Sequence, residues 1–255
     1  MNTRGRSWLH PFSPWAYISQ VPLKAVQTAL LSVFKQWGQP QAIKVDNGRP
    51  FGDPGSDLVP VMALWLIGLG IDVVWNRPRQ PTDNAKVERM QAVTANWAEP
   101  EQCADLAMLQ EHLDEAAHIQ RSLYRCRRLG HQTRAACYPD LLAGGVAYVP
   151  EAFALERVLR FLGQGTWVRK VSQVGQIDFY SQRWQVGAVY RRQQVCLELD
   201  VSSQQWVVRD EADQELKRFS SSFISEATLW SLSLSQRTEA DSAESLLQNS
   251  NAHSR

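Results

Sequence analysis

Strand-like runs alternate with helical patterns through residues 16–75, and this alternation restricts the fold more than any other feature of the sequence. The runs at 16–21, 42–45 and 71–75 are short and contain β-branched and aromatic residues, as strands do. Helical patterns fill the two intervals between them. The order β-α-β-α-β predicts an α/β sheet, whose reactive groups gather at the carboxyl ends of its strands.

Local signals place the helices of this first part. Pro22 stands where the first helix begins and Gly38 where it ends, with apolar residues at helical spacing between them. Ser56 is the expected cap of a second helix over residues 57–69. A third helix, capped by Asp83 or Asn84, is expected to begin just before Glu88, after a loop that contains two prolines.

The second part of the chain changes in character. Further helices are expected at about 101–124 and 150–165. From residue 166 to residue 219, short alternating runs punctuated by glycine and polar turns predict a small antiparallel barrel or sandwich. The polar composition after residue 219 predicts a mobile tail with one turn of helix near Trp230. The predicted organisation is a partial α/β core at 1–100, a helical connector at 101–165, a small all-β barrel at 166–219 and a flexible tail at 220–255.

Composition restricts the class of protein. The chain has 255 residues, of which 44% are hydrophobic, so it can bury a core. Its 27 basic and 26 acidic residues nearly balance, so only a local patch could attract nucleic acid. No secretory signal follows Met1 and the apolar stretch at 58–71 is too short for a bilayer, so we expect a cytoplasmic protein with no membrane partner. The four cysteines lack the spacing of a zinc site.

Two carboxylates stand at positions where an α/β fold places chemistry. Asp46 follows the strand-like run at 42–45 directly, in the tripeptide Asp46-Asn47-Gly48. The same tripeptide also favours a tight turn, so a structural role is the alternative. Glu88 lies 42 residues further on, at the expected start of a helix, where the alternative is an ordinary exposed side chain.

The two segments together resemble the integrase-core superfamily, the ribonuclease-H-like transposases and integrases, and in particular the bacterial insertion-sequence transposases. In that family a strand ends in Asp-Asn-Gly, and the loop Thr-Asn-Gly-Lys-Val-Glu-Arg leads into the helix that bears the catalytic glutamate. Asp83 stands between Thr82 and Asn84 as an additional residue, and Ala85 replaces the usual glycine. The resemblance continues through 129–134, 138–139 and the barrel region, so it covers most of residues 16–219. The residues that correspond to the loop and helix are Thr82, Asp83, Asn84, Ala85, Lys86, Val87, Glu88 and Arg89.

The resemblance implies an incomplete ribonuclease-H-like sheet followed by a small β-barrel, and a reaction that cleaves DNA and transfers a strand. Asp46 and Glu88 would be the catalytic residues and the ligands of two Mg²⁺ ions, which prefer carboxylate oxygens. The family's first aspartate, on an earlier strand, bridges both ions, yet the chain has no acidic residue before Asp46. We therefore expect an N-terminally truncated transposase, weak or absent Mg²⁺ binding, and no strand transfer by this chain alone.

The resemblance also implies double-stranded DNA as the partner, both transposon ends and target, and a homo-oligomer. Basic residues at four places are candidate phosphate contacts, and a solvated protein surface is their alternative. A different class of function stays open, namely a non-catalytic DNA-binding or assembly module derived from a transposase. A relic that does not fold is a further alternative. The candidate DNA contacts are Arg77, Arg79, Asn84, Lys86, Arg89, Arg125, Arg127, Arg128, Arg169 and Lys170.

Overall fold

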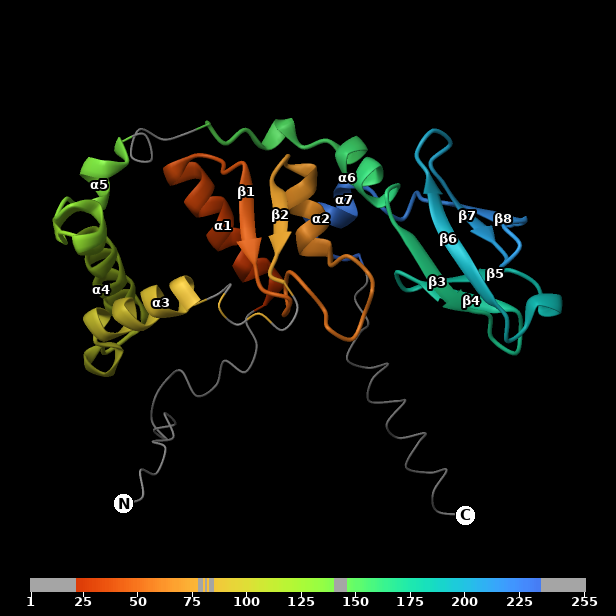
Figure 1. Ribbon diagram of the computed structural model, residues 1–255, viewed down its shortest axis with the longest axis horizontal. Helices are drawn as coiled ribbons and strands as arrows, with labels where there is room; N and C mark the ends of the chain where they lie inside the picture. The colour runs from red at the N-terminus through yellow and green to blue at the C-terminus, as the bar shows by residue number, and fades with distance from the viewer. Residues whose placement is uncertain (1–21, 78–79, 81, 83–84, 140–145, 235–255) are drawn as a thin grey trace, which may run out of the picture. The chain divides into compact units, whose positions relative to one another are not determined.

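The computed structural model describes residues 22–77, 80, 82, 85–139 and 146–234, except the side chains of residues 86 and 87 (Figure 1). The strand expected at 16–21, the helix cap expected at Asp83 or Asn84, and residues 235–255 of the expected tail lie outside this range. The chain divides into two compact units. The first unit comprises residues 1–40 and 76–148, and the second comprises residues 41–75 and 149–255.

The second unit begins with the expected parallel β-α-β motif. Strand β1 (Ala42–Val45) pairs with β2 (Asp72–Trp75) in parallel, with Ala42 opposite Asp72 and Val45 opposite Trp75. Helix α2 (Val61–Gly68) makes the crossover between them. The side chains of residues 62–66 are fully buried, which explains why the helix is apolar on all sides rather than along one stripe.

Helix α2 starts later than the sequence predicts. Pro60 is its N-cap residue, with the extended dihedrals φ −61° and ψ 146°, so residues 57–59 are not helical. A proline disfavours the helical conformation of the residue before it, which prevents the helix from beginning at residue 57. Ser56 does not cap a helix. Its Oγ accepts a hydrogen bond from the backbone N–H of Leu58 at 3.1 Å instead.

The chain after residue 220 is packed as far as residue 234, in contrast to the expected tail. Helix α7 (Glu226–Trp230) begins with a capping box, in which the side chains of Ser225 and Thr228 each accept a hydrogen bond from the other residue's backbone N–H. Leu229 is fully buried, and the ring of Trp230 lies 5.7 Å from that of Trp65 in α2. The predicted turn of helix near Trp230 is confirmed. Composition concealed the few apolar residues that attach this segment to α2.

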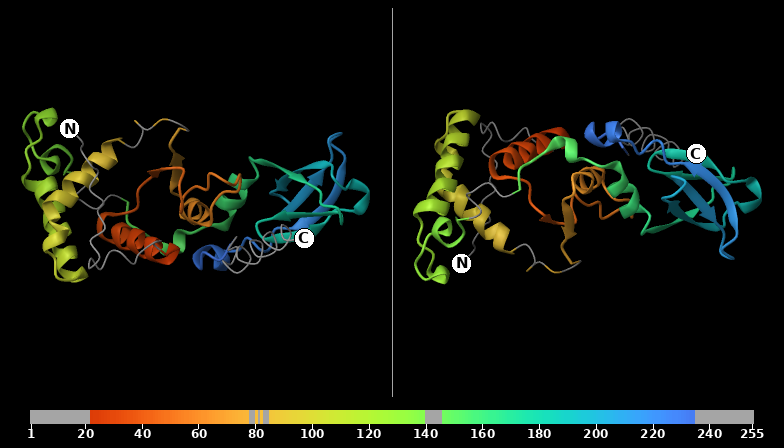
Figure 2. Two further views of the ribbon diagram at one scale, coloured as in Figure 1. Left: turned by 90° about the horizontal axis from the view of Figure 1, so that it is seen from below. Right: turned by 90° about the horizontal axis from the view of Figure 1, so that it is seen from above.

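All six strands expected at 166–219 are present, but among the described residues they do not close into a barrel. Four of them form one antiparallel sheet in the order β3-β6-β7-β8, and the other two form a separate hairpin (Figure 2). Helix α6 (Leu155–Leu162) precedes them. The strands are β3 (Thr166–Lys170), β4 (Gln176–Phe179), β5 (Gln182–Gln185), β6 (Gln194–Asp200), β7 (Gln205–Arg209) and β8 (Glu215–Ser220).

Aromatic rings, rather than backbone hydrogen bonds, join the hairpin to the four-stranded sheet. Phe179 of the hairpin lies 5.7 Å from Trp167 of β3 and 4.6 Å from Trp206 of β7, measured between ring centroids. Trp184 of the hairpin stacks on Phe219 of β8 at 4.7 Å. Sheets that face each other across side chains lie about 10 Å apart, too far for a continuous ladder. The tryptophans therefore form the core, and the sheets stay open.

Three side chains of this β-structure hold the segment before α2. The guanidinium of Arg169 donates to both carboxylate oxygens of Asp57, each at 2.8 Å. The indole N–H of Trp167 donates to the backbone oxygen of Asp57 at 3.2 Å, and the hydroxyl of Tyr180 donates to that of Val59 at 3.1 Å. Burial raises the pKa of Tyr180 well above its usual range, so the hydroxyl keeps its proton. We call these contacts the clamp. They unite residues 41–75 with the β-structure in one unit.

The first unit is helical. It contains α1 (Leu23–Trp37), α3 (Ala85–Ala98), α4 (Leu106–His118), a π-helical segment (Ile119–Leu123) and α5 (Arg134–Cys137). Helices α3 and α4 pack against each other (Figure 1). The helix expected from about residue 101 starts at Leu106, because Asp105 caps it by accepting from the backbone N–H of Met108 at 2.8 Å. No helix in the described parts of the chain is long and apolar enough to cross a membrane.

The clamp predicts unequal effects for two arginines of the same β-structure. Replacing Arg169 by Met should lower the free energy of unfolding by about 1 kcal/mol, because the guanidinium is only 18% exposed and loses two charge-assisted hydrogen bonds, whereas the Asp57 side chain is 55% exposed and can be rehydrated. The matched control is Arg183→Met. The Arg183 side chain is 70% exposed and pairs with an equally exposed Asp178, so its loss should cost less than about 0.5 kcal/mol. Urea unfolding measures both, and equal losses would contradict the role given to the clamp.

Candidate functional site

Asp46 lies at the carboxyl end of β1, exposed, at the beginning of a folded loop. Its Oδ1 accepts from the backbone N–H of Gly48 at 3.3 Å. The backbone N–H groups of Phe51 and Gly52 both donate to the oxygen of Gly48, at 3.2 and 2.8 Å. The indole of Trp75, at the end of β2, donates to the oxygen of Phe51 at 2.8 Å and so ties the loop to the neighbouring strand.

The surroundings of the Asp-Asn-Gly tripeptide bear on both of its interpretations. Because β1 pairs with β2 in parallel, the tripeptide does not form the turn of a β-hairpin between them. Asp46 nevertheless accepts a local hydrogen bond of the kind that aspartate makes in turns. The carboxylate thus stands at the edge of the sheet where α/β proteins bind ligands, on a loop whose backbone is fixed.

Carboxylates near Asp46 in the sequence are engaged elsewhere. Asp53 accepts from the guanidinium of Arg49 at 3.1 Å and from the backbone N–H of Gly55 at 3.2 Å. Asp57 is held by the clamp. Within the described residues, no three acidic, histidine or cysteine side chains gather in a group that could hold a metal ion. Each ion of a Mg²⁺ pair needs several oxygen ligands, which the described carboxylates beside Asp46 do not supply.

Glu88 lies in the first turn of α3, where its side chain is exposed. A negative charge at this place also interacts favourably with the helix dipole, which is a structural role. Glu88 belongs to the first unit, whereas Asp46 belongs to the second. Each carboxylate is thus found at its expected place in the secondary structure, and the joint catalytic role of the two remains a prediction.

The residues expected to contact DNA fall into three groups: exposed residues, one residue held in an ion pair, and residues outside the described range. Arg77, Arg89 and the three arginines at 125, 127 and 128 are exposed, as is Lys170 on β3. Arg169 is different, because its guanidinium is committed to Asp57 in the clamp. Arg79, Asn84 and the side chain of Lys86 lie outside the described residues.

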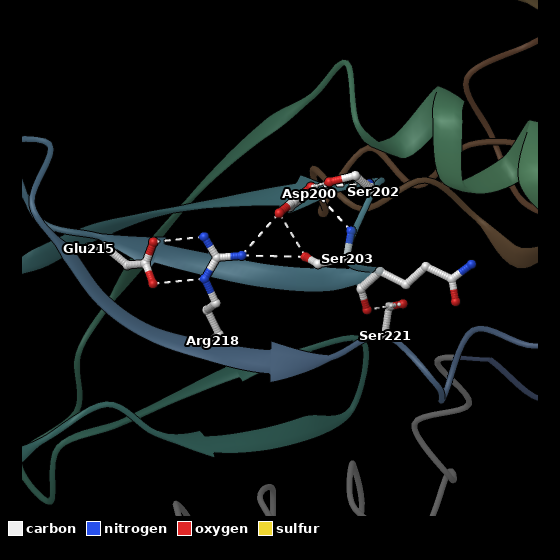
Figure 3. Close-up of polar contacts among 7 residues, drawn as sticks. Asp200, Ser202, Ser203, Glu215, Arg218 and Ser221 are labelled. Carbon is white, nitrogen blue, oxygen red and sulfur yellow. Dashed lines mark hydrogen bonds and ion pairs between the residues drawn. The ribbon is translucent and has the colours of Figure 1, made fainter.

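A polar network that the sequence had suggested only as a turn surrounds Asp200 at the end of β6 (Figure 3). Asp200 accepts from the hydroxyls of Ser202 at 2.5 Å and Ser203 at 2.7 Å, and from Arg218 of β8 at 3.0 Å. Arg218 also donates to both carboxylate oxygens of Glu215, at 2.8 and 2.9 Å. The serine hydroxyls and Arg218 hold the pKa of Asp200 far below its usual range, and Arg218 lowers that of Glu215.

A hollow of about 370 Å³ adjoins this network on the second unit. It contains charges of both signs, but they largely satisfy one another. Arg218 is held by Asp200 and Glu215, and Arg209 donates to the backbone oxygen of Asp213 at 3.0 Å. The hollow therefore offers little uncompensated positive charge for a phosphate. Its charged and hydroxyl lining residues are Thr166, Glu198, Asp200, Arg209 and Arg218.

Known protein families were compared with this chain, and no family model matches it.

In the loop after Asp46, only glycine fits at residue 52. A Cβ atom there would lie 2.3 Å from the backbone oxygen of Asn47, so Gly52→Ala must displace the loop. We expect a loss of about 1–3 kcal/mol in the free energy of unfolding. Gly55→Ala is the control, because its Cβ would meet only Asp53 Oδ1, at 3.7 Å. Comparable chemical-denaturation midpoints for the two variants would show that the loop is not held as described.

The Asp200 network predicts a pH-dependent contribution to stability. Both carboxylates have a lower pKa in the folded state than in the unfolded state, so the network stabilises the protein above about pH 4 and loses its effect as the pH falls through the folded-state values. The Arg218→Met variant should therefore have a lower melting temperature than wild type at pH 7, and this difference in melting temperature should shrink below about pH 4. A difference that stays constant from pH 7 to pH 3 would contradict this. Arg191→Met, on an exposed turn, is the control.

Proposed function

We propose that this chain is a transposase-type protein of DNA transposition, related to the integrase-core superfamily, which binds double-stranded DNA but does not transfer strands by itself. The observation that carries the proposal is the position of Asp46. Its carboxylate follows β1 of a parallel β-α-β motif directly, at the sheet edge where α/β proteins place their reactive groups. Glu88, in the first turn of α3, is the second carboxylate of the resemblance.

We also propose that the catalytic site is incomplete, because this chain supplies too few carboxylates for it. Strand transfer of this type needs ligands for two metal ions, and the sequence holds no acidic residue before Asp46. Asp53 and Asp57 could not serve without breaking their contacts with Arg49 and Arg169. The role left to Asp46 and Glu88 is that of two carboxylates without the third carboxylate that would join them.

Exposed cations support binding to DNA. Arg89 lies one residue after Glu88 on α3, and Lys170 ends β3. Neither has an ion-pair partner in the part of the chain that the structure describes, so each can approach a phosphate without first breaking a salt bridge. Contacts of this kind bind the backbone of DNA regardless of sequence and release counterions.

The second candidate is a non-catalytic DNA-binding or assembly module. One observation favours it over a complete enzyme: the carboxylates that follow Asp46 are used to hold the loop and the clamp rather than to form a cluster. The module and the incomplete transposase both bind duplex DNA, and they differ in whether any joining chemistry survives.

One experiment tests both properties. The full chain is mixed with a labelled duplex that ends in a 3′-hydroxyl, in the presence of Mn²⁺, and both fluorescence anisotropy and joined product on a denaturing gel are measured. We expect binding that weakens steeply between about 50 and 200 mM salt, and no joined product. Lys170→Gln should reduce the slope of the salt dependence by about one, whereas Arg183→Gln, already paired with Asp178, should not change it.

The contrary outcomes are distinct. A flat salt response, or no binding at all, would refute the DNA-binding role. Joined product that disappears in Asp46→Ala would show that the chain is a competent enzyme, and would overturn the proposal that it is incomplete.

A further inference from the structure

Charge is sharply separated along α4, the residues just before it and the turn that follows it. Residues 99–120 contain acidic side chains and no lysine or arginine, whereas residues 121–134 contain arginines and no acidic side chain. Both stretches belong to the first unit. The acidic residues are Glu99, Glu101, Asp105, Glu111, Asp114 and Glu115, and the basic ones are Arg121, Arg125, Arg127, Arg128 and Arg134.

The acidic stretch contributes to a small pocket between the end of α3 and the middle of α4. Its volume is about 220 Å³, and its walls include Trp97, Glu99, His112 and Glu115. Drug-sized ligands occupy pockets of about 300–1,000 Å³, so this one suits a single inserted side chain better. His112 is fixed in the wall, because its Nδ1 donates to the backbone oxygen of Ala98 at 2.8 Å.

The chemistry of this pocket selects a cation. An indole ring attracts a guanidinium or ammonium group through its electron-rich face, and two carboxylates beside it add a direct charge interaction. In the described residues, neither Glu99 nor Glu115 has an ion-pair partner. Guanidinium fits best, because it is planar and can stack on the ring while its N–H groups reach the carboxylates.

The basic stretch presents such groups on a closed turn. The backbone N–H of Cys126 donates to the oxygen of Gln132 at 2.9 Å, and that of His131 donates to the oxygen of Cys126 at 3.1 Å. This turn carries Arg127 and Arg128, which are exposed, as is Arg125 before it. None of the three forms an ion pair within the described residues. A turn that is already fixed loses little conformational entropy when its side chains are bound.

The other two arginines of the stretch are used within the unit. The guanidinium of Arg121 lies 4.3 Å from the centre of the Trp37 ring of α1, and Arg134 donates to the backbone oxygen of Gln120 at 2.6 Å. Their contacts fix the base of the turn, and they leave the arginines at 125, 127 and 128 to face outwards.

An exposed apolar pair connects the pocket to the turn. Trp97 lines the pocket, and its ring lies 5.8 Å from that of Tyr124, which directly precedes Arg125. Trp97 is 39% exposed, Tyr124 49% and the neighbouring Leu123 61%. Exposed aromatic residues flanked by complementary charges are typical of the centre and rim of a protein–protein interface.

We propose that this surface binds the same surface of a second copy of the chain. In a twofold arrangement, Arg127 and Arg128 of each copy approach the acidic pocket of the other, and Trp97 and Tyr124 of both copies meet between the two charge contacts. The surface carries the donor and the acceptor of the interaction side by side, which is the requirement for an isologous interface. Charge complementarity thus identifies the occupant of the pocket as the chain itself.

This dimer does not depend on the proposed DNA activity. It takes Arg127 and Arg128 out of the set of expected DNA contacts and leaves Arg89 and Lys170 for that role. Its test is made without DNA, so its failure would leave the proposed function untouched, and the converse also holds.

The test uses two charge-reversed variants of the full chain, measured by sedimentation equilibrium at low salt. Glu99→Arg with Glu115→Arg makes the pocket basic, and Arg127→Glu with Arg128→Glu makes the turn acidic. Each variant alone should dimerise at least about tenfold more weakly than wild type, because like charges meet at both contacts. An equimolar mixture should recover dimers of near wild-type affinity, since opposite charges meet again at both contacts of the mixed pair.

A matched control separates this interface from a general effect of charge. Glu101→Arg with Glu111→Arg changes the net charge equally, in the same stretch but outside the pocket, and should leave the affinity within about threefold. Circular dichroism checks that every variant is folded. A wild-type chain that stays monomeric at about 100 μM, a mixture that does not associate, or a control as weak as the pocket variant would overturn the proposal. Monomeric wild type would assign the pocket to a cation from another molecule.

Discussion

The bidentate contact between Arg169 and Asp57 is the constraint on which the second unit depends. It joins a strand of the β-structure to the segment that leads into α2, across 112 residues of sequence. With Trp167 and Tyr180 it fixes residues 57–59 at one end of the Asp46 loop, while Trp75 fixes the same loop at Phe51. The candidate carboxylate is therefore carried by a loop that is held from two directions, and its position depends on residues far outside the β-α-β motif.

Periodicity predicted the regular elements well. β1 and β2 lie at the short strand-like runs, and all six strands after residue 166 lie where alternation of apolar residues placed them, because a strand's pattern is a local property. The errors arose where a single residue or a distant contact determines where an element begins or whether a segment is packed. Pro60 delays α2, Asp105 delays α4, and the buried Ile224 and Leu229 hold a segment whose composition is that of a tail. Barrel closure could not be read from alternation, since it depends on how aromatic rings of separate strands meet.

The candidate site was predictable only in part, for the same physical reason. That Asp46 ends a strand and Glu88 begins a helix followed from neighbouring residues. Neighbouring residues do not show which charged side chains are left without an ion pair. Arg169 and Lys170 are adjacent in sequence, yet they point to opposite faces of β3. One is committed to Asp57 and the other is exposed. Ion pairs of this kind depend on the tertiary structure, so a count of basic residues overestimates the surface available to a polyanion.

The burial of α2 has a consequence for how the chain folds. Residues 62–66 are apolar and fully buried, and helices α6 and α7, which cover α2, begin at Leu155 and Glu226. A chain made at about 5–20 residues per second completes α7 roughly 8–33 seconds after Leu66. During that interval α2 has no cover from α7. Contacts over such long stretches of sequence also slow folding, because their loop-closure entropy must be overcome first. During synthesis the apolar surface of α2 therefore stays partly uncovered until residues 226–230 have been made.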